Sequence, residues 1–333
     1  MRILLTASFA DSLINFRASL IQALIAKNCE VHVAAPELNT ESSQYAHLQA
    51  IGAIAHSIPI KRVGINPITD IKSLLCLWRL MQSVQPDIIL SYTIKPVIYG
   101  TLASWFARVP RRFAMITGLG YAFQEKNNRQ LIHSLVCRLY KLVLKKTHKV
   151  IFQNPDDENL FRSLNLLPKH IPSCIINGSG VNLTRYPSTP LSAEPHFLFI
   201  GRLLGDKGVR EYIEAARCIL SRNPYAIFHL VGWIDTNPNA IAQHELDSWI
   251  QEGTVQFHGH LCDVRPTIAN SNIFVLPSYR EGTPRSVLEA MSMGRPIITT
   301  DAPGCRETVV NSDNGFLVPV KSVTHLVLSL IHI

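Results

Sequence analysis

The chain alternates short apolar, β-branched runs with longer segments whose apolar residues recur at helical spacing. Runs this short and this apolar are typical of parallel strands buried on both faces. The alternation predicts a doubly wound α/β sheet with right-handed crossovers. In the first half, the predicted strands are residues 2–8, 30–36, 53–60, 87–93, 111–118 and 149–154, and predicted helices include 16–27, 68–84 and 96–108.

A segment rich in Gly, Pro, Ser and Thr, residues 177–196, interrupts this alternation and is typical of a linker. A chain of 333 residues is also long enough for two domains. We therefore expect one domain over residues 1–185 and a second over residues 186–333. In the second half, the predicted strands are 196–203, 226–233, 255–261, 272–279 and 295–301, with helices such as 209–222 and 241–251.

Composition narrows the class of protein. With 47% apolar and 17% charged residues, the chain can build full cores and is not a disordered polymer. Its seven cysteines are scattered with no close pair, which argues against a zinc site or a disulfide framework and favours a reducing compartment. The first residues lack the features of a secretory signal, and no apolar run is long enough to span a membrane. We expect a cytoplasmic protein.

Positive charge is concentrated in one half. Residues 1–185 hold 21 Lys and Arg against 10 Asp and Glu, whereas residues 186–333 hold 11 against 14. A basic half favours an anionic partner, and without a recognisable nucleic-acid module an anionic membrane surface is the better candidate. Residues 129–149 form an amphipathic basic pattern that suits a helix lying in a membrane interface. The same pattern suits a helix packed on a sheet with a solvated basic face, and the two interpretations are compatible. Its apolar positions are Leu131, Leu135, Leu139, Leu142 and Val143, accompanied by Arg138, Lys141, Lys145, Lys146 and Lys149.

The most informative segment is Pro277–Pro296, PSYREGTPRSVLEAMSMGRP. It places Glu281 in a Gly/Pro loop and Glu289, eight positions later, in a helix that begins near Pro284. A loop that ends at a helix N-terminus presents unpaired N–H groups and the positive end of the helix dipole, which favour a phosphate or other anion. Glu281 can accept hydrogen bonds from a hydroxylated ligand beside that anion, and Glu289 lies two turns further on, within reach of a ribose. Two carboxylates alone could share this spacing by chance, but with their flanking residues they predict a nucleotide-sugar site.

A second segment, GRLLGDKG, runs from Gly201 to Gly208 between a predicted strand and a predicted helix. The glycines allow close approach of the backbone to a ligand. Arg202 offers a planar fork of donors and Lys207 a point charge, a combination suited to a diphosphate. An isolated Arg and Lys near a turn would usually be surface charges, but the strand–loop–helix context favours binding. We see no Asp-x-Asp metal motif, and this pair of cations could neutralise a diphosphate without a divalent ion.

These segments resemble the signature of the family 4 retaining glycosyltransferases, which include sucrose synthases and many bacterial sugar transferases. The resemblance covers essentially the whole chain, is specific within residues 197–316 and is softer before residue 185. It implies the GT-B architecture, in which two Rossmann-like domains face a cleft. Residues 1–185 would then bind the acceptor, and residues 186–333 would bind the nucleotide-sugar donor.

The resemblance also assigns roles to residues of this chain. Arg202 and Lys207 would hold the diphosphate, and Glu281 would contact the donor sugar, so these three are the expected catalytic residues. Donor binding would further involve Gly201, Gly282, Thr283 and Glu289.

The acceptor side is less sharply defined. The loop after the first strand, residues 7–17, lacks the glycine pair of many relatives, although Asn15 and Arg17 stand in a familiar Asn-Phe-Arg sequence. Lys95 follows a buried strand at a predicted helix N-terminus, which suits an acceptor diphosphate, although a lysine that merely solvates the rim fits equally well. We therefore predict Lys95, Asn15 and Arg17 as acceptor-binding residues. The loop Thr117–Tyr121 has no histidine, so we assign no protein base.

The resemblance implies metal-independent transfer, without a cofactor, of a hexose or N-acetylhexosamine from a UDP-sugar through an oxocarbenium-like transition state. In this family the departing phosphate deprotonates the acceptor hydroxyl. The motifs look most like bacterial enzymes that extend an undecaprenyl-diphosphate-linked sugar in O-antigen, capsule or glycoprotein glycan assembly. Such an acceptor would explain the basic N-terminal half and would place the protein on the inner face of the cytoplasmic membrane. Two alternatives are a transferase with a soluble acceptor and a non-catalytic nucleotide-sugar-binding subunit.

The end of the chain also gives rise to an expectation. After residue 320 a helix begins and the sequence stops with LSLIHI, a hexapeptide that a common sequencing-transposon adapter would encode. Relatives continue here through further helices. We expect that the C-terminal helices are truncated and that the donor domain is incomplete at its end.

Overall fold

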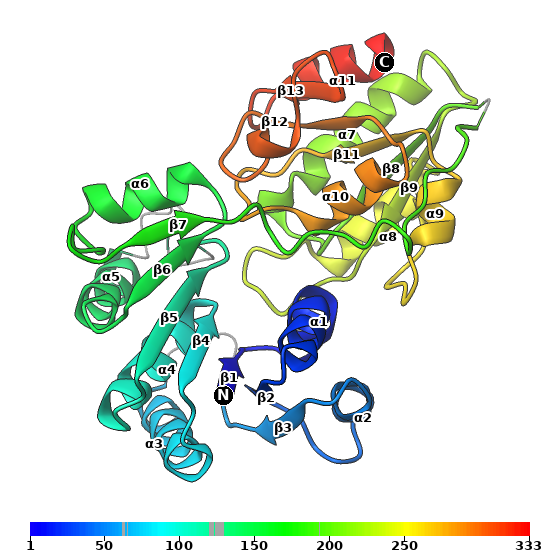
Figure 1. Ribbon diagram of the computed structural model, residues 1–333. Coiled ribbons are helices and arrows are strands. Elements are labelled where there is room, and N and C mark those ends of the chain that lie inside the picture. Colours follow the sequence, from blue (N-terminus) through cyan, green and yellow to red (C-terminus); the bar gives the residue numbers. More distant parts are fainter. Residues whose placement is uncertain (62–63, 65, 120–122, 124–129, 193) are drawn as a thin grey trace. The chain divides into compact units, whose positions relative to one another are not determined.

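The computed structural model describes residues 1–61, 64, 66–119, 123, 130–192 and 194–333, with the backbone alone for residues 130–132. The chain divides into two compact units, Met1–Ser179 and Gly180–Ile333 (Figure 1). Each unit is built on a parallel sheet covered by helices, as the alternating sequence pattern predicts.

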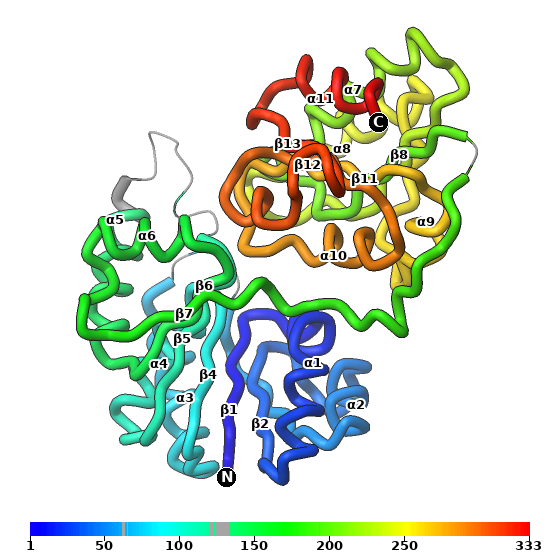
Figure 2. The backbone as a smooth tube through the Cα atoms, turned by 45° about the horizontal axis from the view of Figure 1, so that its top comes forward, coloured from blue at the N-terminus to red at the C-terminus, as the bar shows by residue number. Residues whose placement is uncertain are grey.

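The first unit contains a seven-stranded parallel sheet in the order β3-β2-β1-β4-β5-β6-β7. The N-terminal strand therefore lies inside the sheet, between β2 and β4 (Figure 2). The strands are β1 (Arg2–Thr6), β2 (Glu30–Ala35), β3 (Ile54–Ser57), β4 (Ile88–Tyr92), β5 (Arg111–Ile116), β6 (Lys149–Phe152) and β7 (Ser173–Ile175). The helices are α1 (Ala10–Ala26), α2 (Ser43–Ala50), α3 (Pro67–Val84), α4 (Ile94–Phe106), α5 (Gln130–Leu144) and α6 (Pro155–Ser163).

Alternate residues of β1 face two different cores, as the period of a strand requires. Ile3 and Leu5 pack with Leu13 of α1, whereas Leu4 packs with Leu77 of α3. A third core forms where α4, α5 and α6 cover β5 and β6. A central strand such as β1 is thus apolar on both faces, which explains the short, nearly continuous apolar run of its sequence.

The second unit contains a six-stranded parallel sheet in the order β10-β9-β8-β11-β12-β13, around one large core. Its strands are β8 (His196–Ile200), β9 (Ile227–Val231), β10 (Gln256–Phe257), β11 (Ile273–Leu276), β12 (Ile297–Thr300) and β13 (Gly315–Val318). Its helices are α7 (Val209–Leu220), α8 (Gln243–Gln251), α9 (Arg265–Ala269), α10 (Arg285–Ser292) and α11 (Val323–His332), with 3-10 turns η3 (Gly205–Lys207) and η4 (Arg306–Thr308).

Helix starts follow local chemistry. Asn66 caps α3 by accepting hydrogen bonds from the backbone N–H groups of Ile68 and Thr69, at 3.1 and 3.3 Å. Pro67 follows in the first turn, where its fixed φ costs no hydrogen bond. Helix α1 begins at Ala10, six residues before the predicted start. The prediction was late because Asp11 and Ser12, residue types that favour turns and helix ends, fall within the first turn of the helix.

Helix α5 packs mainly inward. Val136, Tyr140 and Val143 are buried against the sheet, whereas Leu135 and Leu142 are exposed. The side chain of Leu131, which the sequence pattern also placed on the apolar face, lies outside the described residues. The interpretation as a helix packed on a sheet therefore holds for most of this segment. Within the described part of the chain, no helix is long and apolar enough to cross a membrane.

Candidate active site

The order of the second sheet reverses between β8 and β11, the position at which open α/β sheets bind ligands beyond the carboxyl ends of their strands. The loop after β8 is Gly201–Gly208, and the loop after β11 is Pro277–Pro284. These are the two segments that the sequence singled out. The fold brings them together because β8 and β11 are neighbouring parallel strands.

Backbone contacts bind the two loops to each other. The N–H of Tyr279 donates to the carbonyl of Asp206 at 2.8 Å. Gly208 has a φ of +72°, and a Cβ at this position would overlap the carbonyl of Pro277. A glycine is needed here for the left-handed backbone and also for the close approach of the β11 loop. The hydroxyl of Tyr279 donates to Glu211 on α7 at 2.5 Å, and burial, followed by this bond, raises the pKa of the phenol.

Lys207 and Glu281 form an ion pair between the loops. The hydroxyl of Ser278 donates to the same Glu281 oxygen at 2.7 Å. Both charged side chains are largely buried, with 18% and 11% of their surfaces exposed. Cys305 lies nearby, and burial, followed by the charge of Glu281, raises the pKa of its thiol to about 12. The two residues predicted to face the diphosphate and the donor sugar are therefore in direct contact.

Arg202 is held by a residue that the sequence reasoning missed. Its Nη1 lies 2.8 Å from Oδ2 of Asp235, whose side chain is only 5% exposed. Asp235 lies in the loop that follows β9, and two backbone hydrogen bonds connect this loop to the β8 loop. The Leu203 N–H donates to the Trp233 carbonyl at 2.9 Å, and the Gly205 N–H donates to the Asn239 carbonyl at 2.8 Å. A carboxylate directly after a buried strand was the available sequence signal.

Glu289 lies on α10 and is also paired. Nε of Arg285 donates to its Oε1 at 2.8 Å, one helical turn away. Burial, followed by the charge of Glu289 and a hydrogen bond to it, raises the pKa of Tyr186. Glu289, the residue predicted to bind the ribose, is thus held by Arg285 and Tyr186. The sequence analysis did not predict the contact with Tyr186.

The predicted donor-binding residues Gly282 and Thr283 lie in the β11 loop beside Gly304. Gly304 has a φ of +80°, and a Cβ there would overlap the carbonyl oxygens of Glu281 and Gly282. The Glu281 N–H donates to the Pro303 carbonyl at 2.9 Å. The backbone around Gly282 is therefore fixed by the loop that follows β12.

The first sheet also reverses its order, between β1 and β4, and the loops after these strands carry the predicted acceptor residues. Lys95, in the first turn of α4, donates to Asp70 of α3 at 2.9 Å, with side-chain exposures of 13% and 11%. Thr93 precedes the helix with φ +69° and ψ 162°, a region that is essentially reserved for glycine. Its hydroxyl lies 2.9 Å from that of Ser8 in the β1 loop.

Arg17 and Asn15, both predicted to bind the acceptor, lie on different sides of α1. Arg17 is buried, and its guanidinium carbon lies 4.8 Å from the centre of the Tyr92 ring. Tyr92 in turn shares a hydrogen bond of 3.0 Å with Ser12, and burial raises its pKa to about 12. Asn15 lies on the exposed side of α1, because two positions along a helix turn a side chain by about 200°. Gly120 and Tyr121 of the loop without histidine lie outside the described residues.

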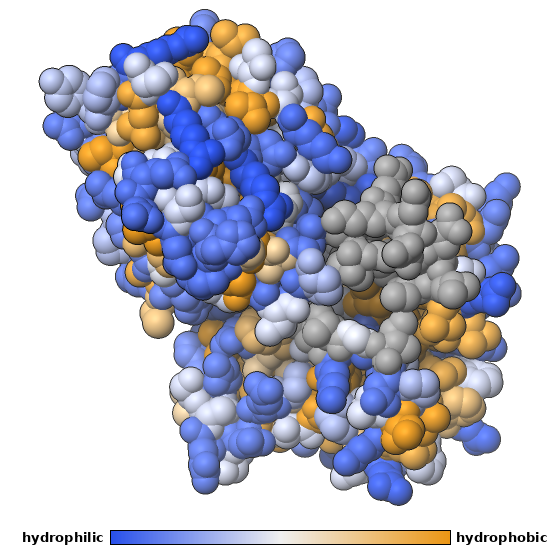
Figure 3. Space-filling model, turned by 180° about the vertical axis from the view of Figure 1, so that it is seen from behind, coloured by the Kyte–Doolittle hydropathy of each residue, from blue (hydrophilic) through white to orange (hydrophobic). Residues whose placement is uncertain are grey.

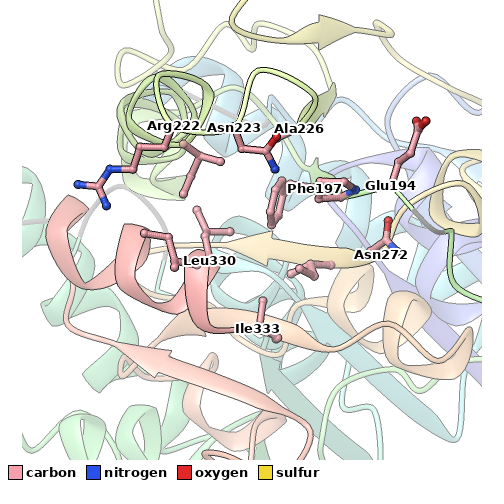
Figure 4. Close-up of a pocket in the computed structure, with 12 residues that line it drawn as sticks. Glu194, Phe197, Arg222, Asn223, Ala226, Asn272, Leu330 and Ile333 are labelled. Atoms are coloured by element: carbon pink, nitrogen blue, oxygen red, sulfur yellow. The ribbon is translucent and has the colours of Figure 1, made fainter.

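A pocket of about 500 Å³ lies at the opposite, amino end of the second sheet. Phe197, Leu330 and Ile333 contribute to its walls, with α11 on one side (Figure 4). It is therefore separate from the loops that carry Arg202 and Glu281. Within the described residues, no three His, Cys, Asp or Glu side chains are grouped closely enough to hold a metal ion.

Comparison with known proteins identifies the class. Residues 194–333 match the family described as glycosyl transferases group 1, and residues 2–154 match glycosyl transferase 4-like proteins. The chain is 31% identical to the N,N'-diacetylbacillosaminyl-diphospho-undecaprenol alpha-1,3-N-acetylgalactosaminyltransferase of Campylobacter jejuni, over 98% of this chain and 87% of that protein. It is 27% identical to the UDP-Gal:alpha-D-GlcNAc-diphosphoundecaprenol alpha-1,3-galactosyltransferase of Escherichia coli, over 84% and 74%.

Solved structures share the fold. Sucrose-phosphate synthase from Thermosynechococcus elongatus superposes with a TM-score of 0.79 at 19% identity, covering 100% of this chain and 89% of that one. HepE of Anabaena in complex with UDP and glucose superposes with a TM-score of 0.74 at 18% identity, with the same coverage. The two parallel sheets are those of a GT-B glycosyltransferase. The chain belongs to glycosyltransferase family 4, as its motifs predicted, and is a glycosyltransferase.

Proposed function

We propose that this enzyme transfers a hexose or N-acetylhexosamine, with retention, from a UDP-sugar to an undecaprenyl-diphosphate-linked sugar. The observation that carries the proposal is the contact between Lys207 and Glu281 at the switch point of the second sheet, beside Arg202. Two of the relatives described above bear names that specify a diphosphoundecaprenol acceptor. The product would enter O-antigen, capsule or glycoprotein glycan assembly.

Each charged residue has a role that follows from its chemistry. Arg202 and Lys207 supply fixed positive charge to the diphosphate, on which negative charge accumulates as the sugar–oxygen bond breaks. Glu281 accepts hydrogen bonds from donor-sugar hydroxyls and keeps Lys207 in place. Glu289 accepts hydrogen bonds from the ribose, and Gly201, Gly282 and Thr283 contribute backbone close to the ligand. The departing phosphate deprotonates the acceptor hydroxyl, so no protein base is required.

The acceptor side rests on the first unit. Lys95 is held in the first turn of α4, where N–H groups also face outward, and this combination suits a diphosphate. Arg17 adds a buried positive charge behind the β1 loop, and Asn15 offers an exposed amide on the same helix. The concentration of basic residues in 1–185 supports a contact with an anionic membrane surface on the cytoplasmic side.

The test is UDP release from a panel of UDP-sugars, measured with and without an undecaprenyl-diphosphate-linked sugar. We expect turnover of one donor that requires the lipid-linked acceptor and is lost in Glu281→Ala. Glu252→Ala is the matched control, because it removes an exposed carboxylate of the same unit that is paired with Arg217. Turnover on soluble sugars alone would contradict the acceptor assignment. Donor binding without turnover on any acceptor would contradict catalysis.

A further inference from the structure

Helix α3 leaves an apolar stripe uncovered. Ile68, Ile71, Leu75 and Trp78 are 80%, 58%, 45% and 38% exposed, and their spacing of three and four residues places them on one side of the helix. The opposite side of α3 packs into the core through residues such as Leu77. Seen from behind, hydrophobic and hydrophilic residues lie side by side on the surface of the first unit (Figure 3). A continuous exposed stripe of this kind marks an interaction surface, unlike scattered single residues.

The surroundings of the stripe are basic. Lys72 and Arg79 are exposed beside it on the same helix. Between residues 61 and 112 the sequence has eight Lys and Arg but only two acidic residues, Asp70 and Asp87. Asp70 is buried and paired with Lys95, and Asp87 accepts a hydrogen bond from the Arg2 N–H at 2.8 Å. The surface therefore offers apolar contact and positive charge together.

We propose that α3 docks on an anionic phospholipid bilayer, with Ile68, Ile71, Leu75 and Trp78 (the α3 stripe) in contact with the lipid. A helix with an apolar side, a tryptophan and flanking cations suits the membrane interface, where the cations meet anionic headgroups. This inference rests on the proposed function, because the acceptor of that reaction lies in the same bilayer.

The position of the stripe relates docking to the acceptor site. Asp70, which holds Lys95, stands between Ile68 and Ile71 in the first turn of α3. The turn that would enter the interface is therefore the turn that holds the lysine proposed to bind the acceptor diphosphate. A lipid-linked diphosphate lies at headgroup level, so docking through the α3 stripe would present Lys95 at the corresponding depth.

Helix α5 provides the competing surface. Its exposed Leu135 and Leu142 are seven residues apart, and the residues between them include the buried Val136 and Tyr140. Among the described side chains of α5, these two leucines are the large apolar residues that are exposed, which gives two apolar contacts rather than a continuous stripe. A double substitution of these leucines is therefore a matched control for a double substitution on α3.

The experiment is co-sedimentation of the full chain with vesicles of phosphatidylcholine, with and without phosphatidylglycerol. We expect binding that requires phosphatidylglycerol. Ile71→Ser with Leu75→Ser should weaken it at least about tenfold, because apolar area leaves the lipid. Lys72→Glu with Arg79→Glu should weaken it by a similar factor. Leu135→Ser with Leu142→Ser should retain it within about twofold, because α5 stays outside the interface. All positions are exposed, and unchanged thermal unfolding confirms that each variant folds.

Three results would overturn the docking proposal: no binding by the unaltered chain, equal binding to neutral vesicles, or loss of binding in the α5 variant alone. The two proposals can fail separately, since co-sedimentation uses neither donor nor acceptor. UDP release with a short-chain, water-soluble acceptor diphosphate should persist in the Ile71/Leu75 variant and be lost in Glu281→Ala. Vesicle binding without any transfer would contradict the proposed reaction and leave docking intact.

Discussion

Lys207 and Glu281 are 74 residues apart in the sequence and hydrogen-bonded in the folded chain. The contact joins the loop after β8 to the loop after β11, the two strands at which the second sheet reverses its order. In the proposed mechanism, a cation that faces the diphosphate and a carboxylate that faces the sugar therefore position each other.

Because these residues act as a unit, the effects of removing them should not add. We expect Lys207→Ala and Glu281→Ala each to lower kcat about 100-fold or more, as the loss of a preorganised electrostatic contact does. The double variant should lose little beyond the worse single variant. Steady-state UDP release from all four proteins completes the cycle, and strictly multiplicative losses would show that the two side chains act independently.

Asp235 should act through Arg202. Asp235→Asn keeps the shape of the side chain but removes the charge that orients the guanidinium at 2.8 Å. We expect the KM for the donor to rise about tenfold, because a hydrogen bond to a charged group contributes roughly 1.5–3 kcal/mol. The KM for the acceptor should stay unchanged. Asp263→Asn, at an exposed ion pair with Arg265, is the control. Equal changes in both KM values would point to a general disturbance of the unit.

Two glycines distinguish backbone strain from close packing. Gly208 and Gly259 have similar φ values, +72° and +67°, but a Cβ would overlap Pro277 only at Gly208, whereas nothing lies within 4 Å of it at Gly259. Alanine at either site costs about 1 kcal/mol for the left-handed backbone. Gly208→Ala should cost about 2 kcal/mol more, because the β11 loop must move. Urea unfolding of both variants measures the difference, and equal free energies of unfolding would contradict the close contact.

A row of histidines should make stability depend on pH. Nε2 of His229 lies 3.0 Å from Nδ1 of His196, and its Nδ1 lies 3.0 Å from Nε2 of His258. Burial, followed by the charges of His258 and His196, lowers the pKa of His229 to about 4. Below its ordinary pKa of about 6.5, the unfolded chain takes up a proton that the folded chain does not. The contribution of His229 to the free energy of unfolding should therefore fall as the pH drops from about 6.5 to about 4, and then level off.

Urea unfolding across this pH range tests the assignment. His229→Gln cannot titrate, so its free energy of unfolding should fall less steeply than that of the unaltered chain. Parallel curves for the two proteins would show that the slope comes from other groups.

The alternation of apolar runs predicted both parallel sheets, because strands buried on two faces leave a strong local pattern. It missed β7, β13 and the helix α2. Residues typical of turns stand next to these elements, namely Pro172 before β7, Asn314 and Gly315 at β13, and Ser42 and Ser43 at α2, so the local pattern resembles a loop. The donor loops were found because their charged residues stand next to glycines in short motifs. The partners Asp235 and Asp70 were missed because ion pairs between distant segments depend on how strands and helices pack in three dimensions, which local sequence does not encode.

Thr93 has a consequence for any attempt to redesign this enzyme. Its backbone occupies a region that glycine enters freely and a β-branched residue does not, so glycine there would relieve strain of the order of 1–3 kcal/mol. A search that ranks substitutions by stability alone would choose that change. It would also remove the hydroxyl that meets Ser8 at the reversal point of the first sheet. A thermostabilised version of the enzyme should therefore keep threonine at this position and gain its stability elsewhere.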